Sequence, residues 1–363
     1  MKYIRYGSLL TALFLVSPFI SKAQYEDDLI KFFQAGQEDG IALTNAYIGP
    51  AVTGISYALN GAWFHTARPH RLGGFDINIA ITPVFIPKSQ DRFDPMNLGL
   101  QTVVGFRNTS NLGEGAPTML GPAENSRYYV NFDLNGNGVS NTEANPFADE
   151  GDSFSGPQGI DLRNTIKVAP VGSPMIQIGV GLVKNTDIML RFTPKLNISP
   201  STAQLIGGGL RHDIKQHIRG LRSLPFELSV MGGYTNIKIT TDLSGLASSF
   251  PPATTDGVQE TTYTTDAFLG EALVSKKLGI LTLFGGIGYN YLSTRASITG
   301  SYTFFNNSPA EFVLNDPYAA TFTNSGMRLD AGFRLNILAF YLYSNYTFQE
   351  YQAVTVGLGF TFN

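Results

Sequence analysis

The chain has 363 residues, of which 15% are charged and 12% aromatic, with 39 glycines and no cysteine. Its 25 basic and 28 acidic side chains give a formal net charge of −3, which argues against a nucleic-acid partner, because nucleic acids are bound by basic surfaces. The lack of cysteine excludes disulfides and a lipid-anchored lipoprotein. The charged fraction lies well below the roughly 25% of soluble domains, which favours a membrane protein.

The first 23 residues have the features of an export signal. Lys2 and Arg5 precede an apolar run at residues 9–20, which is too short to cross a bilayer as a helix. Small residues before Gln24 predict cleavage at the Ala23–Gln24 junction. The sequence therefore predicts an exported protein, located in the bacterial outer membrane if its strands close into a barrel.

Residues 24–50 are expected to form a plug or hatch before the first strand. Residues 26–35 begin with acids, which suit a helix N-terminus, and place Leu29, Phe32 and Phe33 on one side. We therefore divide the chain into a signal peptide (1–23), a plug segment (24–50) and a barrel (51–363).

Alternation with period 2 predicts a transmembrane antiparallel β-barrel, because each strand has lipid on one face and the lumen on the other. In residues 354–362 every second side chain is apolar, and the segment ends in aromatic residues, as the C-terminal strands of outer-membrane barrels do. In residues 187–196 and 328–337 the charges lie opposite the apolar row. A soluble β-sandwich also alternates, but the export signal and strand lengths of about 10 residues favour the barrel.

Turn residues divide the chain into about 14 strands, an even number as expected for a bacterial barrel. Twelve are clear, near residues 52–66, 72–86, 98–107, 174–184, 187–197, 203–211, 226–240, 261–276, 280–304, 322–337, 338–348 and 351–362. Residues 128–134 and 160–169 would add a hairpin. Short turns would face the periplasm, and the long stretches 107–173, 241–260 and 305–321 would form outer loops.

Two irregularities fall within this pattern. Residues 213–222 favour a short amphipathic helix at the periplasmic rim, ended by Pro225. After Tyr234 the apolar parity shifts, which indicates either a bulge near Gly232 and Gly233 or a strand that leaves the membrane.

Charges on the lumen face are the main candidate site. Arginines among them could bind the carboxylate head of an amphiphile, or the set could form ion pairs that fill the barrel or hold the plug. The inward set consists of Asp76, Asp187, Arg191, Lys195, Glu227, Arg328, Asp330 and Arg334.

An outer loop contains a candidate calcium site. Asp133, Asn135 and Asn137 occupy alternate positions before a glycine, as in the first half of an EF-hand loop, although Ala144 stands where that loop needs a glutamate. The alternative is a turn rich in glycine and asparagine that binds no metal.

No catalytic constellation is evident, so we expect that the protein is not an enzyme. His65 and His70 are expected in an outer loop, where neighbouring arginines would contact lipopolysaccharide phosphates. Interfacial girdle positions are expected for Trp63, Phe64, Tyr128, Tyr129, Tyr289, Tyr291, Tyr341 and Tyr343.

Two stretches carry a family resemblance: residues 45–75 (NAYIGPAVTGISYALNGAWFHTARPHRLGGF) and residues 208–234 (GGLRHDIKQHIRGLRSLPFELSVMGGY). They resemble an uncharacterised outer-membrane family of Bacteroidota, which is in turn similar to the long-chain fatty-acid transporter (FadL-like) barrels. The resemblance implies a barrel of about 14 strands with an N-terminal hatch. Gly49-Pro50-Ala51 stands where the transporters have Asn-Pro-Ala, so the hatch motif departs from theirs.

The leading functional hypothesis is a barrel that passes hydrophobic or amphiphilic small molecules, with the N-terminal segment as hatch. The alternative is a non-transporting accessory subunit of a secretion or barrel-assembly complex. The expected partners are outer-membrane lipid, lipopolysaccharide and other outer-membrane proteins. An apolar pocket beneath the hatch would favour transport, and a lumen blocked by charges would favour the subunit.

Overall fold

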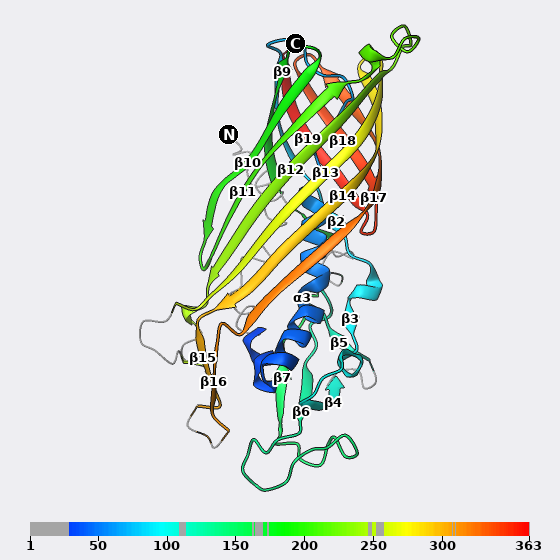
Figure 1. The fold of residues 1–363 in the computed structure, drawn as a ribbon. Helices are drawn as coiled ribbons and strands as arrows, with labels where there is room; N and C mark the ends of the chain where they lie inside the picture. Colours follow the sequence, from blue (N-terminus) through cyan, green and yellow to red (C-terminus); the bar gives the residue numbers. More distant parts are fainter. Residues whose placement is uncertain are drawn as a thin grey trace, which may run out of the picture.

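The computed structural model describes residues 29–108, 114–161, 163, 170–172, 174–245, 249–251, 258–306, 308 and 310–362. Ten antiparallel strands close into a barrel, each paired with the next and the last with the first (Figure 1). In spatial order they are β1 (Phe75–Ile81), β9 (Pro174–Leu182), β10 (Thr186–Ile198), β11 (Ser201–Asp213), β12 (Glu227–Asp242), β13 (Glu260–Leu278), β14 (Leu281–Thr299), β17 (Tyr318–Ile337), β18 (Phe340–Phe348) and β19 (Ala353–Phe362).

The outer face of the barrel is apolar and the inner face is largely polar, as the alternation predicts. Ile77 and Leu358 are 42% and 56% exposed on the outside, whereas Asp76 and Thr355 on the same two strands are buried inside. A closed sheet with such a belt satisfies its backbone hydrogen bonds in lipid. The antiparallel barrel is therefore confirmed, with ten strands rather than about 14. No helix in the described part of the chain is long and apolar enough to cross a membrane.

Four of the predicted strands are not among the ten strands of the barrel. Residues 52–66 are not a strand: helix α3 (Gln37–Leu59) occupies the first part, and an irregular segment of turns and bends follows. Residues 98–107 and 128–134 only partly overlap β4 (Val103–Asn108) and β6 (Ser126–Val130), which pair in a separate sheet outside the barrel. Most of residues 160–169 lie outside the described residues. Alternation alone did not separate barrel strands from these elements, because half-buried helices and loops also mix apolar and polar residues.

Helix α3 enters the barrel at its long-loop end and ends inside it (Figure 1). Residues 60–74, here called the lumen segment, continue through the barrel to the short-turn end, where β1 begins. That end carries the tight β9–β10, β13–β14 and β17–β18 turns. The structure thus places the boundary between plug and barrel after Gly74, and not after Pro50.

The segment before α3 lies at the long-loop end rather than under the short turns. Leu29 and Ile30 are helical and lead into a 3-10 helix, η2 (Lys31–Ala35), whose Phe32 and Phe33 are buried. Phe32 packs edge-on against Tyr47 of α3, with ring centroids 5.7 Å apart. This segment therefore belongs to the apolar core at the long-loop end.

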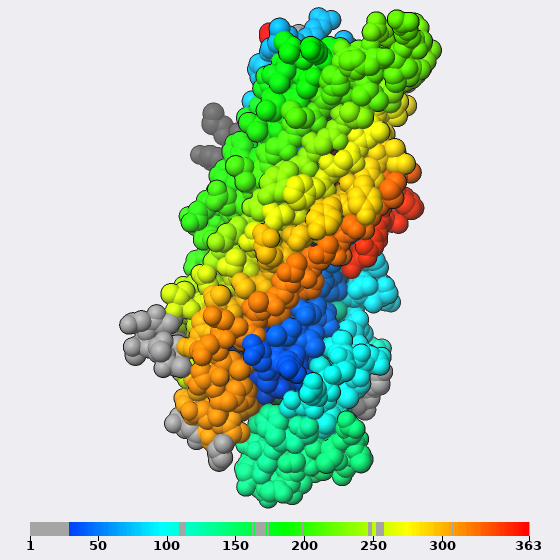
Figure 2. Space-filling model, in the orientation of Figure 1, coloured from blue at the N-terminus to red at the C-terminus, as the bar shows by residue number. Residues whose placement is uncertain are grey.

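A small domain, here called the cap, is formed by the described residues between 86 and 161. It contains β4, β6 and β7 (Ser153–Gly156) in one sheet and the short pair β3 (Arg92–Phe93) and β5 (Ala116–Pro117). Two further short strands, β2 (Val84–Phe85) and β8 (Pro170–Val171), connect the cap to the barrel edge. The cap covers the open end of the barrel beside α3 (Figure 2).

The barrel has a slanted rim at this end. Strands β12, β13, β14 and β17 have 16 to 20 residues, whereas β1, β9, β18 and β19 have 7 to 10. The long strands continue as a half-open wall against which α3 packs, and beyond β14 the hairpin β15 (Ser301–Phe304) and β16 (Phe312–Asn315) extends from it (Figure 1). Ser56 of α3 and Thr294 of β14 are joined by a hydroxyl–hydroxyl hydrogen bond of 2.9 Å.

Asp39 joins the plug to the cap. Its buried carboxylate accepts backbone N–H groups of Gln101, Thr102 and Val103 at 2.8–2.9 Å. The acid also lies in the first turn of α3, where a negative charge is favoured by the helix dipole. One side chain thus stabilises the start of the helix and the position of the cap.

One local expectation is wrong, and of the two explanations given for the parity shift after Tyr234 only the bulge is ruled out. Residues 213–222 contain only the three-residue 3-10 helix η5 (Lys215–His217), because β11 continues through Asp213. The register of β12 is unbroken on both sides, so Gly232 and Gly233 form no bulge. The apolar parity shifts because Ile237 and Ile239 face inward, toward the plug, where the core rather than lipid needs apolar side chains.

Gly233 and Gly209 leave room for the ring of Trp63, the chain's only tryptophan. A Cβ atom at Gly233 would lie 2.6 Å from that ring, whereas one at Gly270 would have nothing within 4 Å. We expect Gly233→Ala to displace Trp63 and destabilise the fold by about 1–3 kcal/mol. Intrinsic fluorescence should show a shifted Trp63 emission for Gly233→Ala and an unchanged one for the control Gly270→Ala. Identical spectra for both would contradict this position of the lumen segment.

Candidate functional site

Two arginines of the barrel wall bind the C-terminal end of helix α3. Arg191 Nη1 donates to the carbonyl of Leu59 at 2.9 Å, and Arg328 Nη1 donates to the carbonyl of Asn60 at 2.8 Å. Carbonyls at a helix C-terminus have no partner within the helix and carry the negative end of its dipole. Cationic donors from the wall therefore hold the helix where it ends inside the barrel.

Arg191 also fixes Trp63, a large and fully buried side chain of the lumen segment. Its guanidinium lies 3.4 Å from the ring centroid of Trp63, and Nη2 donates to Gln177 at 2.9 Å. Gln177 in turn donates to the carbonyl of Trp63 at 3.2 Å. Stacking and hydrogen bonding thus combine to lock this part of the lumen segment.

Arg328 belongs to a buried ion cluster. Its Nε and Nη2 donate to both oxygens of Asp330 at 2.7 Å, and Glu271 lies 3.7 Å from Nε. Thr347 and Asn345 donate to the same aspartate at 2.6 Å each. Such a cluster is costly to break, because removing one member leaves the other charges buried without compensation.

A second chain of contacts links the lumen segment to β1 and β17. Arg334 Nη1 lies 2.8 Å from His65 Nδ1, and His65 Nε2 lies 2.9 Å from Asp76. Because arginine only donates, Nδ1 must accept, and the network therefore assigns the proton of a neutral His65 to Nε2, which donates to Asp76. Tyr341 donates to the same carboxylate at 2.5 Å.

Asp187 closes the lumen near the short turns. Its carboxylate accepts the backbone N–H of His70 at 2.9 Å and is paired with Arg211. Arg211 Nη1 also donates to the carbonyl of Thr66 at 2.7 Å. The lumen segment is therefore held by wall side chains along its whole length.

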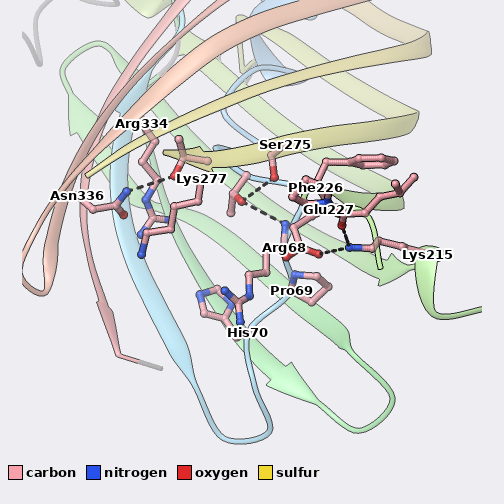
Figure 3. Close-up of a pocket in the computed structure, with 14 residues that line it drawn as sticks. Arg68, Pro69, His70, Lys215, Phe226, Glu227, Ser275, Lys277, Arg334 and Asn336 are labelled. Carbon is pink, nitrogen blue, oxygen red and sulfur yellow. Dashed lines mark hydrogen bonds and ion pairs between the residues drawn. The ribbon is translucent and has the colours of Figure 1, made fainter. Parts of the chain in front are cut away.

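A cavity of about 290 Å³ opens beside the lumen segment at the short-turn end (Figure 3). Its polar lining is dominated by cations, with Glu227 as the acid that faces them. The lining residues are Thr66, Arg68, Pro69, His70, Lys215, Leu224, Pro225, Phe226, Glu227, Ser275, Lys277, Thr282, Arg334 and Asn336. We call this space the mouth pocket.

Residues 1–362 match a family of unknown function, DUF6588. The chain belongs to this family. No curated protein sequence matches the DUF6588 chain significantly.

Solved barrel structures resemble this DUF6588 member only weakly. The translocator domain of the autotransporter NalP from Neisseria meningitidis is 12% identical, with a TM-score of 0.29. The match covers 88% of this chain and 98% of the NalP domain. Ail of Yersinia pestis is 8% identical with a TM-score of 0.23, covering 80% and 99%. The toluene transporter TbuX of Ralstonia pickettii is 9% identical with a TM-score of 0.22, covering 85% and 97%. Scores this low carry no argument about function.

The inward charges predicted for this DUF6588 chain are mostly inside the barrel. Asp76, Asp187, Arg191, Arg328, Asp330 and Arg334 are buried there. Lys195 is not: it is exposed and lies within the register shift between Thr193 and Leu196, where the alternation is interrupted. Glu227 lies at the mouth pocket, 3.8 Å from Lys215.

Several lumen residues were not foreseen. Strand parity could have indicated Arg211, Glu271, Tyr341 and Tyr343, because they occupy inward positions of β11, β13 and β18. The residues of the lumen segment had no such signal. Trp63, Phe64, His65 and His70 lie inside the barrel, so the expected outer loop and girdle positions for them are wrong.

Of the aromatic residues expected in an interfacial girdle, only some lie on the outer face of the barrel. Tyr289 and Tyr291 are exposed on the outer face, whereas Tyr341 and Tyr343 point inward because they occupy the opposite parity. Tyr128 and Tyr129 are buried in the cap.

The candidate calcium loop lies in the cap and is closed by its own hydrogen bonds. Asp133 accepts backbone N–H groups from Gly136 to Gly138, and Asn135 and Asn137 donate to Asp149. The bond from Asn135 lowers the pKa of Asp149, and burial raises the pKa of Asp152 nearby. Among the described residues, no three His, Cys, Asp or Glu side chains are grouped to hold a metal. Calcium binding by this loop stays a prediction of the sequence.

The Arg328 cluster gives a direct test of how the lumen is held. We expect Arg328→Met to destabilise the barrel by about 3–5 kcal/mol, because Asp330 and Glu271 would stay buried without their cation. The matched control is Arg295→Met, which removes an exposed partner of Asp266 and should cost no more than about 1 kcal/mol. Denaturant unfolding from lipid vesicles measures both. Equal losses for the two variants would contradict the cluster's role.

Proposed function

We propose that the protein is a non-conducting barrel of the bacterial outer membrane that serves as an accessory subunit of a larger complex. The observation that carries this proposal is a lumen filled by the protein's own plug. At the level of Trp63, the side chains of Trp63, Arg191 and Tyr343 are each no more than 1% exposed. These polar inward groups contact the lumen segment instead of water, unlike the lining of a porin.

The proposed orientation follows from the lengths of the connections. Short turns of outer-membrane barrels face the periplasm, and long connections face outward. The mouth pocket would then open to the periplasm, and the cap would be presented outside the cell. A folded cap tied to the plug by Asp39 is a surface suited to a protein partner.

Passage of a hydrophobic or amphiphilic molecule is the second candidate, in line with the resemblance to an outer-membrane family of Bacteroidota that is itself similar to the fatty-acid transporters. The mouth pocket favours it, because it is a cavity of about 290 Å³ next to the lumen segment. Passage would require the plug to leave the wall, breaking the Arg191, Arg328 and Arg211 contacts together. The polar lining of the pocket also differs from the apolar sites typical of such ligands.

A reversible tether distinguishes the two functions, since the chain has no cysteine of its own. Ser56→Cys with Thr294→Cys replaces hydroxyls 2.9 Å apart, close enough for a disulfide between α3 and β14. We expect no uptake of labelled fatty acid into proteoliposomes in either redox state. We also expect the oxidised form to retain the same stoichiometric partner on gentle extraction from native membranes.

The single variant Ser56→Cys, under the same oxidant, is the control. Uptake by the reduced form that oxidation abolishes would establish transport by plug movement instead. A barrel that elutes alone in every form would contradict the subunit assignment.

A further inference from the structure

The geometry of the mouth pocket points to a binding site for a phosphate group, either of a small phosphate ester or of a phospholipid headgroup. This inference concerns the short-turn end of the barrel and is independent of whether the protein transports anything. Ion pairs that only fill the barrel do not explain this pocket, because its cations outnumber its acids.

The charge balance of the pocket is the first argument. Arg68, Lys215, Lys277 and Arg334 line it, and Glu227 is the acid among the lining residues. Glu227 pairs with Lys215 at 3.8 Å, and Lys215 also donates to the carbonyls of Leu224 and Phe226. Within the described part of the chain, neither Arg68 nor Lys277 is paired with a carboxylate. A phosphate carries up to two negative charges and three acceptor oxygens, so it balances these cations better than one carboxylate does.

Arg334 is the second argument, because it is buried but incompletely satisfied. The residue is only 7% exposed, and Nε has no hydrogen-bond partner among the described residues. Its Nη1 contacts the neutral His65, which separates the guanidinium from the carboxylate of Asp76, so no anion contacts it directly among the described residues. A buried guanidinium is costly without an anion, and it offers a planar set of donors that fits phosphate oxygens.

The remaining lining suits an ester better than a bare ion. The hydroxyls of Thr66 and Ser275, joined at 3.2 Å, line the same pocket as the cations. Figure 3 shows Ser275 among the labelled lining residues. The wall on the Lys215 side is apolar, formed by Leu224, Pro225 and Phe226. Its volume of about 290 Å³ is near the lower limit of small-molecule sites, which begin at about 300 Å³. A phosphate with an organic substituent would use both parts of the pocket.

Binding is tested with the full-length protein in detergent, titrated with inorganic phosphate and, separately, with acetate. The variant combines Arg68→Ala and Lys277→Ala, two side chains at the solvent edge of the pocket. The matched control is Lys276→Ala, the preceding residue on the opposite face of β13. We expect the double variant to bind phosphate at least about tenfold more weakly, with the control unchanged. Urea unfolding confirms that each variant is folded.

Native mass spectrometry of protein extracted from membranes then identifies the source. A retained phospholipid that the double variant loses indicates a lipid headgroup. Phosphate binding without retained lipid indicates a small phosphate ester. The proposal is overturned if wild-type protein binds no phosphate at millimolar concentration, if the double variant binds as well, or if acetate binds as tightly as phosphate.

Discussion

The burial of a helix C-terminus inside a membrane barrel is the constraint on which the rest of the structure depends. The last carbonyls of α3 and those of the lumen segment are removed from water, and each unpaired polar group in such a place would cost several kcal/mol. Arginines from three wall strands supply the donors, at Leu59, Asn60 and Thr66. The plug and the barrel therefore complete each other's hydrogen bonding.

This constraint explains the asymmetric shape of the wall. The half of the barrel built from β12 to β17 continues past the rim because α3 needs a surface along its length. On that extension the inward parity carries apolar side chains, as at Ile237 and Ile239, instead of charges. The cap covers the other side of the helix, with Asp39 joining the two. Inside the barrel the plug is held by polar contacts with the wall. At the long-loop end it is held by an apolar core.

Strand parity allowed the barrel and most of its inward charges to be predicted, since an antiparallel strand in lipid must alternate. The strand count could not be derived in the same way. Residues 52–59 alternate apolar and small residues but continue helix α3, because they pack against a wall rather than beside another strand. The lumen segment has no period, since its conformation depends on partners such as Arg191 and Asp187 that are distant in sequence. The mouth pocket also could not be predicted from the sequence, because its lining residues come from four separate parts of the chain.

The central claim is that the plug closes the barrel in its resting state. The most direct measurement is ion conductance of wild-type protein inserted in planar lipid bilayers, with an open porin as the positive control. The account predicts no steps above the bilayer background at moderate voltage, because wall arginines hold the lumen segment at Leu59, Asn60 and Thr66. Stable single-channel steps from the wild-type barrel would contradict it.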